Sequence, residues 1–165
     1  MPNYVRSKQK GGTFFFTVAL QNRQSCLLID HIDLLRESVR YVKSRRPFTI
    51  VAWVVLPDHI HAVWTLPDGD NDFSRRWQLI KTLFTKKLKA TTQYKHSIWQ
   101  KRFWEHEIRT SDDLTAHINY CYLNPVKHGL VASTHEWPYS SFHRDVQRHL
   151  FDHNWNSIIS DKNEK

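Results

Sequence analysis

The chain has 165 residues, enough for one domain and a short tail, and its 40% hydrophobic content is enough to form a core. Lys and Arg outnumber Asp and Glu by 24 to 16, and the net charge of +8 favours an acidic partner such as nucleic acid. No apolar run is long enough to cross a bilayer and no signal peptide is evident, so we expect no membrane partner. Two cysteines exclude a disulfide framework, which favours a cytosolic location.

The first half of the chain predicts a strand, a helix and a hairpin. The aromatic run at 13–20 follows a glycine pair and is typical of a strand. Apolar positions spaced three and four apart predict a helix over 30–44, which ends before a proline. Two apolar runs, 48–56 and 59–66, flank a Pro-Asp turn and indicate a hairpin of buried strands.

The second half predicts a loop at 67–72, a helix from a Ser74 cap to about Ala90, and a short strand at 104–109. Ser111 then opens a helix whose acidic first turn complements its positive end, and Asn124-Pro125 closes that helix. A short helical stretch ends near Leu150, and we expect the last residues to fray.

This order of elements, β-α-β-β-α-β with extra C-terminal helices, predicts an α+β, ferredoxin-like fold. In that fold helices cover one face of the sheet, and we expect the other face to be free for a site. We assign residues 1–150 to a single domain and 151–165 to a C-terminal tail.

The positive charge is concentrated between Asn71 and Thr110, where ten Lys and Arg face three Asp and Glu. Aromatic residues alternate with this charge in the segment 99–104. Basic side chains beside exposed rings neutralise phosphates and stack on bases, although a solvated helix face beside core aromatics would give the same composition.

Two histidines in the triplet His59-Ile60-His61 predict a metal site. Alternate side chains of a strand share a face, so both imidazoles point the same way and can share one ion. Two hydrogen-bonded or exposed histidines are the alternative, and a chain with 11 His shows such a triplet by chance quite often.

A second pair lies on the helix that begins at Ser111. Tyr120 and Asn124 are four residues apart and share one helix face, while Tyr122 points roughly 160° away from Asn124 at about 100° per residue. A phenol and an amide oxygen close together can serve as a nucleophile and a third metal ligand. Alternatively, Tyr120 packs and Asn124 caps the helix before the proline.

Together these residues are suited to phosphodiester cleavage. A free tyrosine has a pKa of about 10 and is a weak nucleophile. A divalent cation on His59, His61 and Asn124 would compensate for this weakness by polarising the phosphate. Attack by the phenol conserves bond energy in a phosphotyrosine, so rejoining the DNA strand needs no nucleotide. In agreement, the chain has no Gly-rich phosphate loop of the kind that binds nucleoside triphosphates.

These motifs resemble the REP-associated tyrosine transposases, which are single-tyrosine transposases of the HUH (His, hydrophobic, His) group that act on repetitive extragenic palindromes (REP). The resemblance covers about residues 11–150 and lies in Leu56-Pro57-Asp58-His59-Ile60-His61, Trp99 with Arg102-Phe103-Trp104-Glu105-His106, Tyr120-x-Tyr122-x-Asn124-Pro125-Val126-Lys127-x-Gly129, and Trp137-Pro138-Tyr139-Ser140-Ser141.

The resemblance implies an HUH nuclease fold in which His59, His61 and Asn124 bind Mg²⁺ or Mn²⁺ and Tyr120 is the nucleophile. It implies a metal-dependent endonuclease and strand transferase that acts on single-stranded REP hairpins through a covalent phosphotyrosine, as a monomer in the bacterial cytosol or nucleoid. The basic and aromatic residues expected to contact this DNA are Arg6, Lys8, Lys10, Arg75, Arg76, Lys81, Trp99, Lys101, Arg102 and Phe103.

Two departures from the family pattern stay open at this point. Tyr122 stands where many relatives have His and is a competing nucleophile, although its predicted orientation favours Tyr120. Asp58 is either a partner of a ligand histidine or a turn residue. The alternative functions are a non-catalytic, sequence-specific nucleic-acid-binding module, such as an RNA-recognition domain, or an inactive domesticated transposase.

Overall fold

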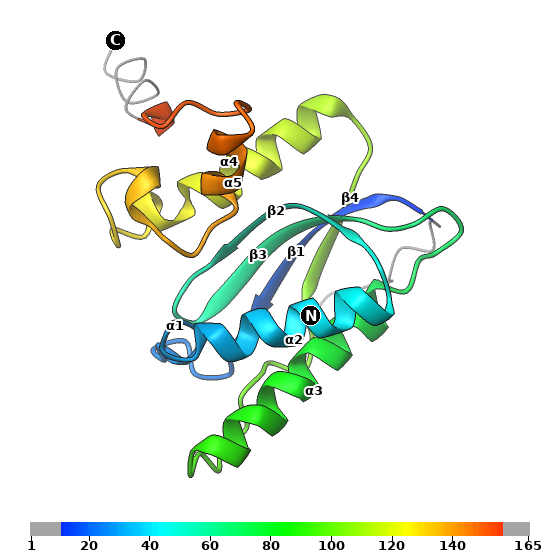
Figure 1. Cartoon of the computed structure of the whole chain (residues 1–165), viewed down its shortest axis with the longest axis vertical. Coiled ribbons are helices and arrows are strands. Elements are labelled where there is room, and N and C mark those ends of the chain that lie inside the picture. The colour runs from blue at the N-terminus through cyan, green and yellow to red at the C-terminus, as the bar shows by residue number, and fades with distance from the viewer. Residues whose placement is uncertain (1–10, 157–165) are drawn as a thin grey trace.

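The computed structural model describes residues 11–156, in which helices pack on both faces of one four-stranded antiparallel sheet (Figure 1). The sheet order is β2-β3-β1-β4, from the strands β1 (Thr13–Ala19), β2 (Thr49–Val55), β3 (His59–Thr65) and β4 (Trp104–Ile108). The helices are α1 (Leu27–Asp30), α2 (Ile32–Arg45), α3 (Phe73–Thr91), α4 (Ser111–Lys127), the 3₁₀ helix η1 (Thr134–Glu136) and α5 (Phe142–Gln147). The predicted α+β, ferredoxin-like order with extra C-terminal helices is confirmed.

The first face of the sheet packs on α2 and α3, which lie below it in Figure 1. Because strand side chains alternate, Phe14 and Phe16 of β1 point into this core together with Trp64 of β3. Trp64 stacks on Trp77 of α3, with ring centroids 4.3 Å apart. This aromatic core fixes β1 and β3, the two central strands, and thereby the position of the residues on their other face.

The second face is covered by α4 and by the chain that follows it. Phe15 and Val63 point into this second core, where they meet Tyr122 of α4 and Phe142 of α5. The expectation that this face is free is therefore wrong, because the apolar side of α4 needs burial as much as the sheet does. His59 and His61 share this face with Val63, so the tyrosine helix lies directly over the histidine strand.

The observed ends of the elements differ slightly from the predicted ones. Asp72, not Ser74, caps α3, and its carboxylate accepts a hydrogen bond from the Arg75 amide at 3.1 Å. The short helix α1 has no counterpart in the prediction, because four residues are too few to show a helical period.

The assigned tail begins inside a packed region. Phe151 and Trp155 contact Phe142, and the Asn156 side chain accepts a hydrogen bond from the Thr134 amide at 2.9 Å. Trp155 belongs to this second core and contacts neither histidine of the triplet. Residues up to Asn156 thus pack with the domain, whereas the residues expected to fray lie outside the described range.

Within residues 11–156 no helix combines the length and the hydropathy needed to cross a lipid bilayer.

Candidate active site

The two histidines of β3 are buried and held in one orientation. His59 and His61 expose only 5% and 4% of their surface, and their rings lie 4.8 Å apart. His59 Nδ1 bonds the Asp58 carboxylate at 2.9 Å, and His61 Nδ1 bonds the Thr17 hydroxyl, also at 2.9 Å. A hydrogen bond at Nδ1 leaves Nε2 as the coordinating nitrogen, which is the usual arrangement of a metal-binding imidazole.

Burial keeps these imidazoles neutral. It lowers the pKa of His61 to about 3, with the charges of His59 and His128 adding to the effect. Burial also lowers the pKa of His59, against the opposing effect of Asp58. Burial alone would raise the pKa of Asp58, but hydrogen bonds from Arg23 and His59 outweigh it and the pKa is lowered. A neutral ring beside an ionised carboxylate has the protonation state that a metal ligand needs.

Helix α4 presents a second row of polar side chains to these histidines. Tyr120, Asn124 and His128 follow one another at intervals of four residues, so they line one face of the helix and its C-cap. The Tyr120 ring lies 5.1 Å from the His61 ring, and the His128 ring lies 5.5 Å from the His59 ring. Asn124 is thus placed between two residues that both contact the histidine pair.

Asn124 is completely buried, and neither atom of its amide has a hydrogen-bond partner among the described residues. A buried unpaired amide costs stability, so natural proteins keep one where something else binds it. An amide oxygen together with two imidazole nitrogens is a suitable donor set for a divalent cation. These residues therefore fit the metal site predicted from the sequence.

The end of α4 differs from the prediction. The helix continues through Pro125 to Lys127, and the Asn124 carbonyl accepts a hydrogen bond from the His128 amide at 3.0 Å. The position before a proline disfavours helical geometry, but both Asn124 and Pro125 are buried, and this tertiary packing outweighs the local preference. The continuation keeps Asn124 in register with Tyr120.

The two tyrosines of α4 have different surroundings. Tyr120 is 38% exposed beside His61 and Phe15. Tyr122 is fully buried on the opposite side of the helix, where its hydroxyl donates to Asp145 and bonds Ser141. Burial raises the pKa of Tyr122, and the hydrogen bond to Asp145 adds to this rise. Of these two tyrosines, Tyr120 is the accessible one, and it lies beside the histidine pair.

Three cationic or titratable side chains around the pair were not predicted as site residues. Arg23 bonds Asp58 at 2.6 Å, Lys127 Nζ lies 5.2 Å from the centroid of the Tyr120 ring, and His128 contacts His59. Lys127 follows the Asn-Pro pair in the sequence, so helical spacing beyond the proline would have found it. Arg23 lies in a loop, and nothing in the local sequence indicates its position.

The residues predicted to contact DNA fall into three groups. Arg75, Lys101 and Arg102 are exposed. Lys81, Trp99 and Phe103 are half-buried and packed together, with Lys81 Nζ 5.9 Å and 5.6 Å from the two ring centroids. Arg6, Lys8 and Lys10 lie outside the described residues.

Arg76 is the exception, because the structure contradicts its predicted role in contacting DNA. Its side chain is 1% exposed, and it hydrogen-bonds the Asp70 carboxylate and the carbonyls of Arg46 and Pro47. Charge alone does not distinguish a surface arginine from one that ties loops together, so the sequence could not show this role.

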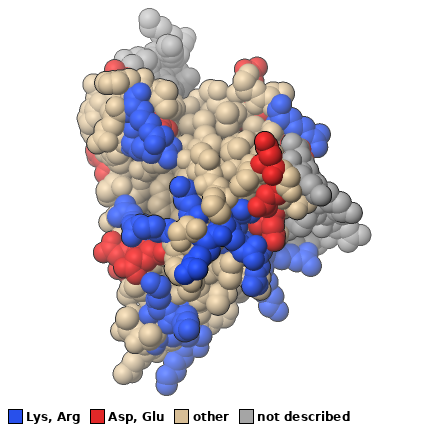
Figure 2. Space-filling view, turned by 45° about the vertical axis from the view of Figure 1, so that its right-hand side comes forward, with Lys and Arg blue, Asp and Glu red and all other residues tan. Residues whose placement is uncertain are grey.

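The exposed basic residues gather beside α3. Figure 2 shows Lys and Arg side chains collected in the middle and along the lower end of one face, with acidic side chains beside them. A shallow groove of about 440 Å³ lies here, between α3 and the segment 99–101. Its lining includes Lys81, Lys86 and Lys101 but no Asp or Glu. Such a surface is suited to a phosphate backbone.

Comparisons with known proteins show the family to which the chain belongs. Residues 11–112 match the family described as transposase IS200 like. A REP-associated tyrosine transposase of Escherichia coli K12 is 50% identical over 161 residues, which is 98% of this chain and 94% of that protein. The chain belongs to the REP-associated tyrosine transposases. A putative REP-associated tyrosine transposase of Haemophilus influenzae is 44% identical over 164 residues, which is 94% of this chain and 93% of that protein.

Solved structures of related proteins show the same fold. A REP-associated tyrosine transposase bound to a REP hairpin superposes with a TM-score of 0.88 at 52% identity, covering 94% of this chain and 91% of that chain. A putative transposase from Deinococcus radiodurans has a TM-score of 0.50 at 15% identity over 74% of this chain and 96% of its own, and it shows the fold alone. By its identity to the Escherichia coli protein and its family match, this transposase is an enzyme of the tyrosine class.

Proposed function

We propose that this transposase is a metal-dependent, single-stranded DNA endonuclease and strand transferase that acts on REP hairpins through a covalent phosphotyrosine. One observation carries the proposal. The accessible Tyr120 and the buried Asn124 lie on one face of α4, and Tyr120 contacts His61 of the histidine pair. The proposed nucleophile is thus accessible to solvent and lies beside one of the proposed metal ligands.

Tyr120 is the nucleophile in this proposal. Its phenolic oxygen attacks a backbone phosphorus, so that one phosphorus–oxygen bond to the tyrosine forms as one bond within the DNA strand breaks. The phenolic proton passes to solvent, and the departing strand leaves with a free hydroxyl. Because the energy of the broken bond is kept in the new one, a second strand's hydroxyl can reverse the step and join to the phosphate.

His59, His61 and Asn124 would hold the divalent cation, for which the family resemblance indicates Mg²⁺ or Mn²⁺. When bound, the cation supplies polarisation of a phosphate oxygen and neutralises developing charge. The chain's own cations act beside it. Lys127, over the Tyr120 ring, would attract the DNA phosphate and stabilise negative charge on the phenol. Arg23, bonded to Asp58, adds positive charge beside His59.

The DNA partner is inferred from the relatives and from the charge of the surface. The solved relative is described as bound to a REP hairpin, and this chain is 52% identical to it. We place the hairpin backbone along the basic groove beside α3, with Arg75, Lys101 and Arg102 as phosphate contacts. Lys81 and Trp99 form the half-buried wall of the groove, and Phe103 packs against Lys81. Arg6, Lys8 and Lys10 stay candidates for base contacts. Phosphate contacts set the register, and base contacts would specify the sequence.

We infer that the active unit is a monomer acting on DNA in the bacterial cytosol. The histidine pair and Tyr120 come from the same chain and already lie in contact, so no second copy has to supply the tyrosine helix. Sedimentation equilibrium at cleavage-assay concentrations checks this, with a single species near 19.8 kDa expected. A dimer at these concentrations would contradict it.

The central test is covalent capture. The transposase is incubated with Mn²⁺ and an end-labelled single-stranded REP hairpin, and denaturing electrophoresis detects labelled protein. We expect an adduct with the wild type, none with Tyr120→Phe, and none for the wild type in excess EDTA. An adduct that survives in Tyr120→Phe contradicts the proposed nucleophile. Binding without an adduct under any metal would favour a non-catalytic binding module or an inactive transposase.

A further inference from the structure

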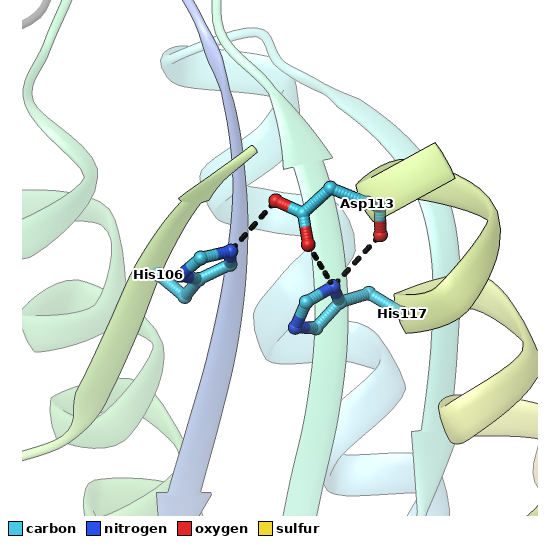
Figure 3. Close-up of side chains that lie close together, drawn as sticks. All are labelled: His106, Asp113 and His117. Carbon is cyan, nitrogen blue, oxygen red and sulfur yellow. Dashed lines mark hydrogen bonds and ion pairs between the residues drawn. The ribbon is translucent and has the colours of Figure 1, made fainter. Parts of the chain in front are cut away.

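A second cluster of metal-ligating side chains lies on the same sheet face, separated from His61 by the ring of Phe15. It consists of His106 on β4 and of Asp113 and His117 on the first two turns of α4 (Figure 3). The Phe15 ring lies 5.6 Å from the His61 ring and 4.7 Å from the His117 ring. The proposed cleavage reaction uses none of these three residues.

The cluster is already assembled around one carboxylate. His106 Nε2 lies 2.7 Å from Asp113 Oδ2, and His117 Nδ1 lies 3.1 Å from Asp113 Oδ1. His117 Nδ1 is also 2.8 Å from the Asp113 carbonyl oxygen, and Figure 3 shows both imidazoles directed at the carboxylate. One ligand atom from each residue lies within 4.8 Å of the other two. All three side chains are partly exposed, so an ion can enter from solvent.

We propose that His106, Asp113 and His117 bind a transition-metal ion of the Zn²⁺ class. Two imidazole nitrogens with one carboxylate oxygen are a donor set that Zn²⁺ favours, with bonds of about 2.0–2.2 Å. Neighbouring ligand atoms around such an ion are roughly 3 Å apart, because bonds of that length meet at angles near 90–110°. The distances from the Asp113 carboxylate oxygens to His106 Nε2 and to His117 Nδ1, 2.7 and 3.1 Å, are of this size. Solvent would fill the remaining positions of the ion.

The same three side chains can hold one another without an ion, because each imidazole N–H donates to the carboxylate. The ion replaces these N–H protons, which requires each ring to present a lone pair instead. The contacts that orient the rings stay in place, namely the i to i+4 spacing of Asp113 and His117 on α4 and the packing of His117 on Phe15. Binding therefore needs only a small closure of the cluster.

An ion at this place would fasten the tyrosine helix to the sheet. His106 lies on β4, which pairs with β1 at Phe15, whereas Asp113 and His117 precede Tyr120 on α4 by two turns and by one. An ion shared by β4 and α4 links these two elements directly and limits movement of the helix segment that carries Tyr120. The ion has a positioning and stabilising role and is not part of the cleavage step.

The test counts bound ions per chain in the full-length protein. Metal-free transposase is titrated with Co²⁺ and then Zn²⁺ by equilibrium dialysis, in excess Mg²⁺ to suppress weak oxygen-ligand sites. We expect His106→Gln and His117→Gln each to bind one ion fewer than the wild type. Zn²⁺ should raise the melting temperature of the wild type more than that of either variant. His96→Gln removes an exposed histidine away from the cluster and should bind as many ions as the wild type.

Two further variants separate this inference from folding defects and from the proposed function. Asp113→Asn keeps the size of the side chain and one acceptor oxygen but removes the charge and the second acceptor oxygen, and we expect at least about tenfold weaker Zn²⁺ binding. His61→Gln should keep the ion of the cluster, whatever happens at the histidine pair. Equal ion counts for wild type and His106→Gln, or unchanged affinity in Asp113→Asn, would overturn the proposal.

Discussion

Asn124 illustrates how a single residue trades stability for function. Its amide is fully buried between Tyr120 and His128 on the helix face, without a protein partner among the described residues. Leaving such a group unpaired costs about 1–3 kcal/mol of folding free energy. A cation ligand role would account for keeping it, because the ion supplies the missing interaction.

This leads to a prediction for Asn124→Leu, which is similar in size but apolar. In the absence of metal, we expect the free energy of unfolding to rise by about 1 kcal/mol, because the unpaired amide is gone. Hairpin cleavage should fall at least about tenfold with the loss of one metal ligand. Urea denaturation and a cleavage assay measure both. Asn119→Leu on the same helix is the control for cleavage, and a fully active Asn124→Leu would contradict the ligand role.

Trp104 is the exposed aromatic residue of the segment 99–104, with 56% of its surface accessible. On β4 it pairs with Thr17 of β1, which in turn pairs with His61 and bonds its imidazole. Residues directly opposite in a sheet point to the same side, so the indole lies on the face of the histidine pair, with β1 between its strand and β3. That location is suited to stacking on a base next to the scissile phosphate.

We therefore expect Trp104→Ala to weaken hairpin binding by about 1–3 kcal/mol, or roughly 5- to 150-fold in Kd. Trp104→Phe should recover most of the affinity, since a ring remains. Fluorescence anisotropy with a labelled hairpin gives both values. The single-turnover rate at saturating DNA should change little, and unchanged affinity in Trp104→Ala would exclude a stacking role.

At the scale of elements, α4 has two different faces. One face carries Tyr120 and Asn124 toward the histidine pair, and the other buries Tyr122 against Ser141 and Asp145. Thr110 caps the start of the helix, and its hydroxyl accepts a hydrogen bond from the Asp113 amide at 3.1 Å. A helix fixed at its start and along its buried side holds the reactive face at a constant position.

The two faces predict opposite behaviour for the two tyrosines. Tyr122→Phe removes a buried hydroxyl and leaves Asp145 without that donor, so we expect a loss of about 1–3 kcal/mol in unfolding free energy. Below its unfolding temperature this variant should still form the covalent adduct. Thermal denaturation and the capture assay decide the matter together. A stable Tyr122→Phe variant that forms no adduct would contradict the assignment of the nucleophile to Tyr120.

The site elements differ in how well the sequence predicts them. His59 and His61 on one strand face follow from a period of two, and Tyr120 with Asn124 from helical spacing, so both pairs are predictable locally. The continuation of α4 through Pro125 and the burial of Arg76 depend on tertiary packing, which no local pattern contains. His106 lies on a strand and His117 on a helix, and the fold brings both side chains to one carboxylate.

At the scale of the whole molecule, Arg76 joins three parts of the chain. From α3 it binds the Asp70 carboxylate through both terminal nitrogens, at 3.0 and 2.8 Å, and the carbonyls that follow α2. The guanidinium is almost fully buried, so its charge depends on Asp70 for compensation. The hydrogen bond from Arg76 holds the pKa of Asp70 at about 2, below its ordinary 3.8.

This pair predicts an acid-sensitive contribution to stability. Because the pKa of Asp70 is lower in the folded state, the unfolded state binds the proton first as pH falls, so the contribution is complete above about pH 4 and lost toward pH 2. Asp70→Asn should destabilise the protein by roughly 2–3 kcal/mol at pH 7, less than for a fully buried pair. Urea denaturation at pH 7 and pH 2.5 should show the wild type and the variant converging at the lower pH. A constant difference between them would contradict the assignment.

The outer edge of the sheet at β2 is closed by the chain itself. The Val55 amide bonds the Tyr139 carbonyl, the Ser141 amide bonds the Trp53 carbonyl, and Arg144 donates to the carbonyls of Ile50 and Val51. An open edge strand invites strands from other molecules and begins aggregation. With these edge groups already bonded within the chain, β2 offers little template for such growth.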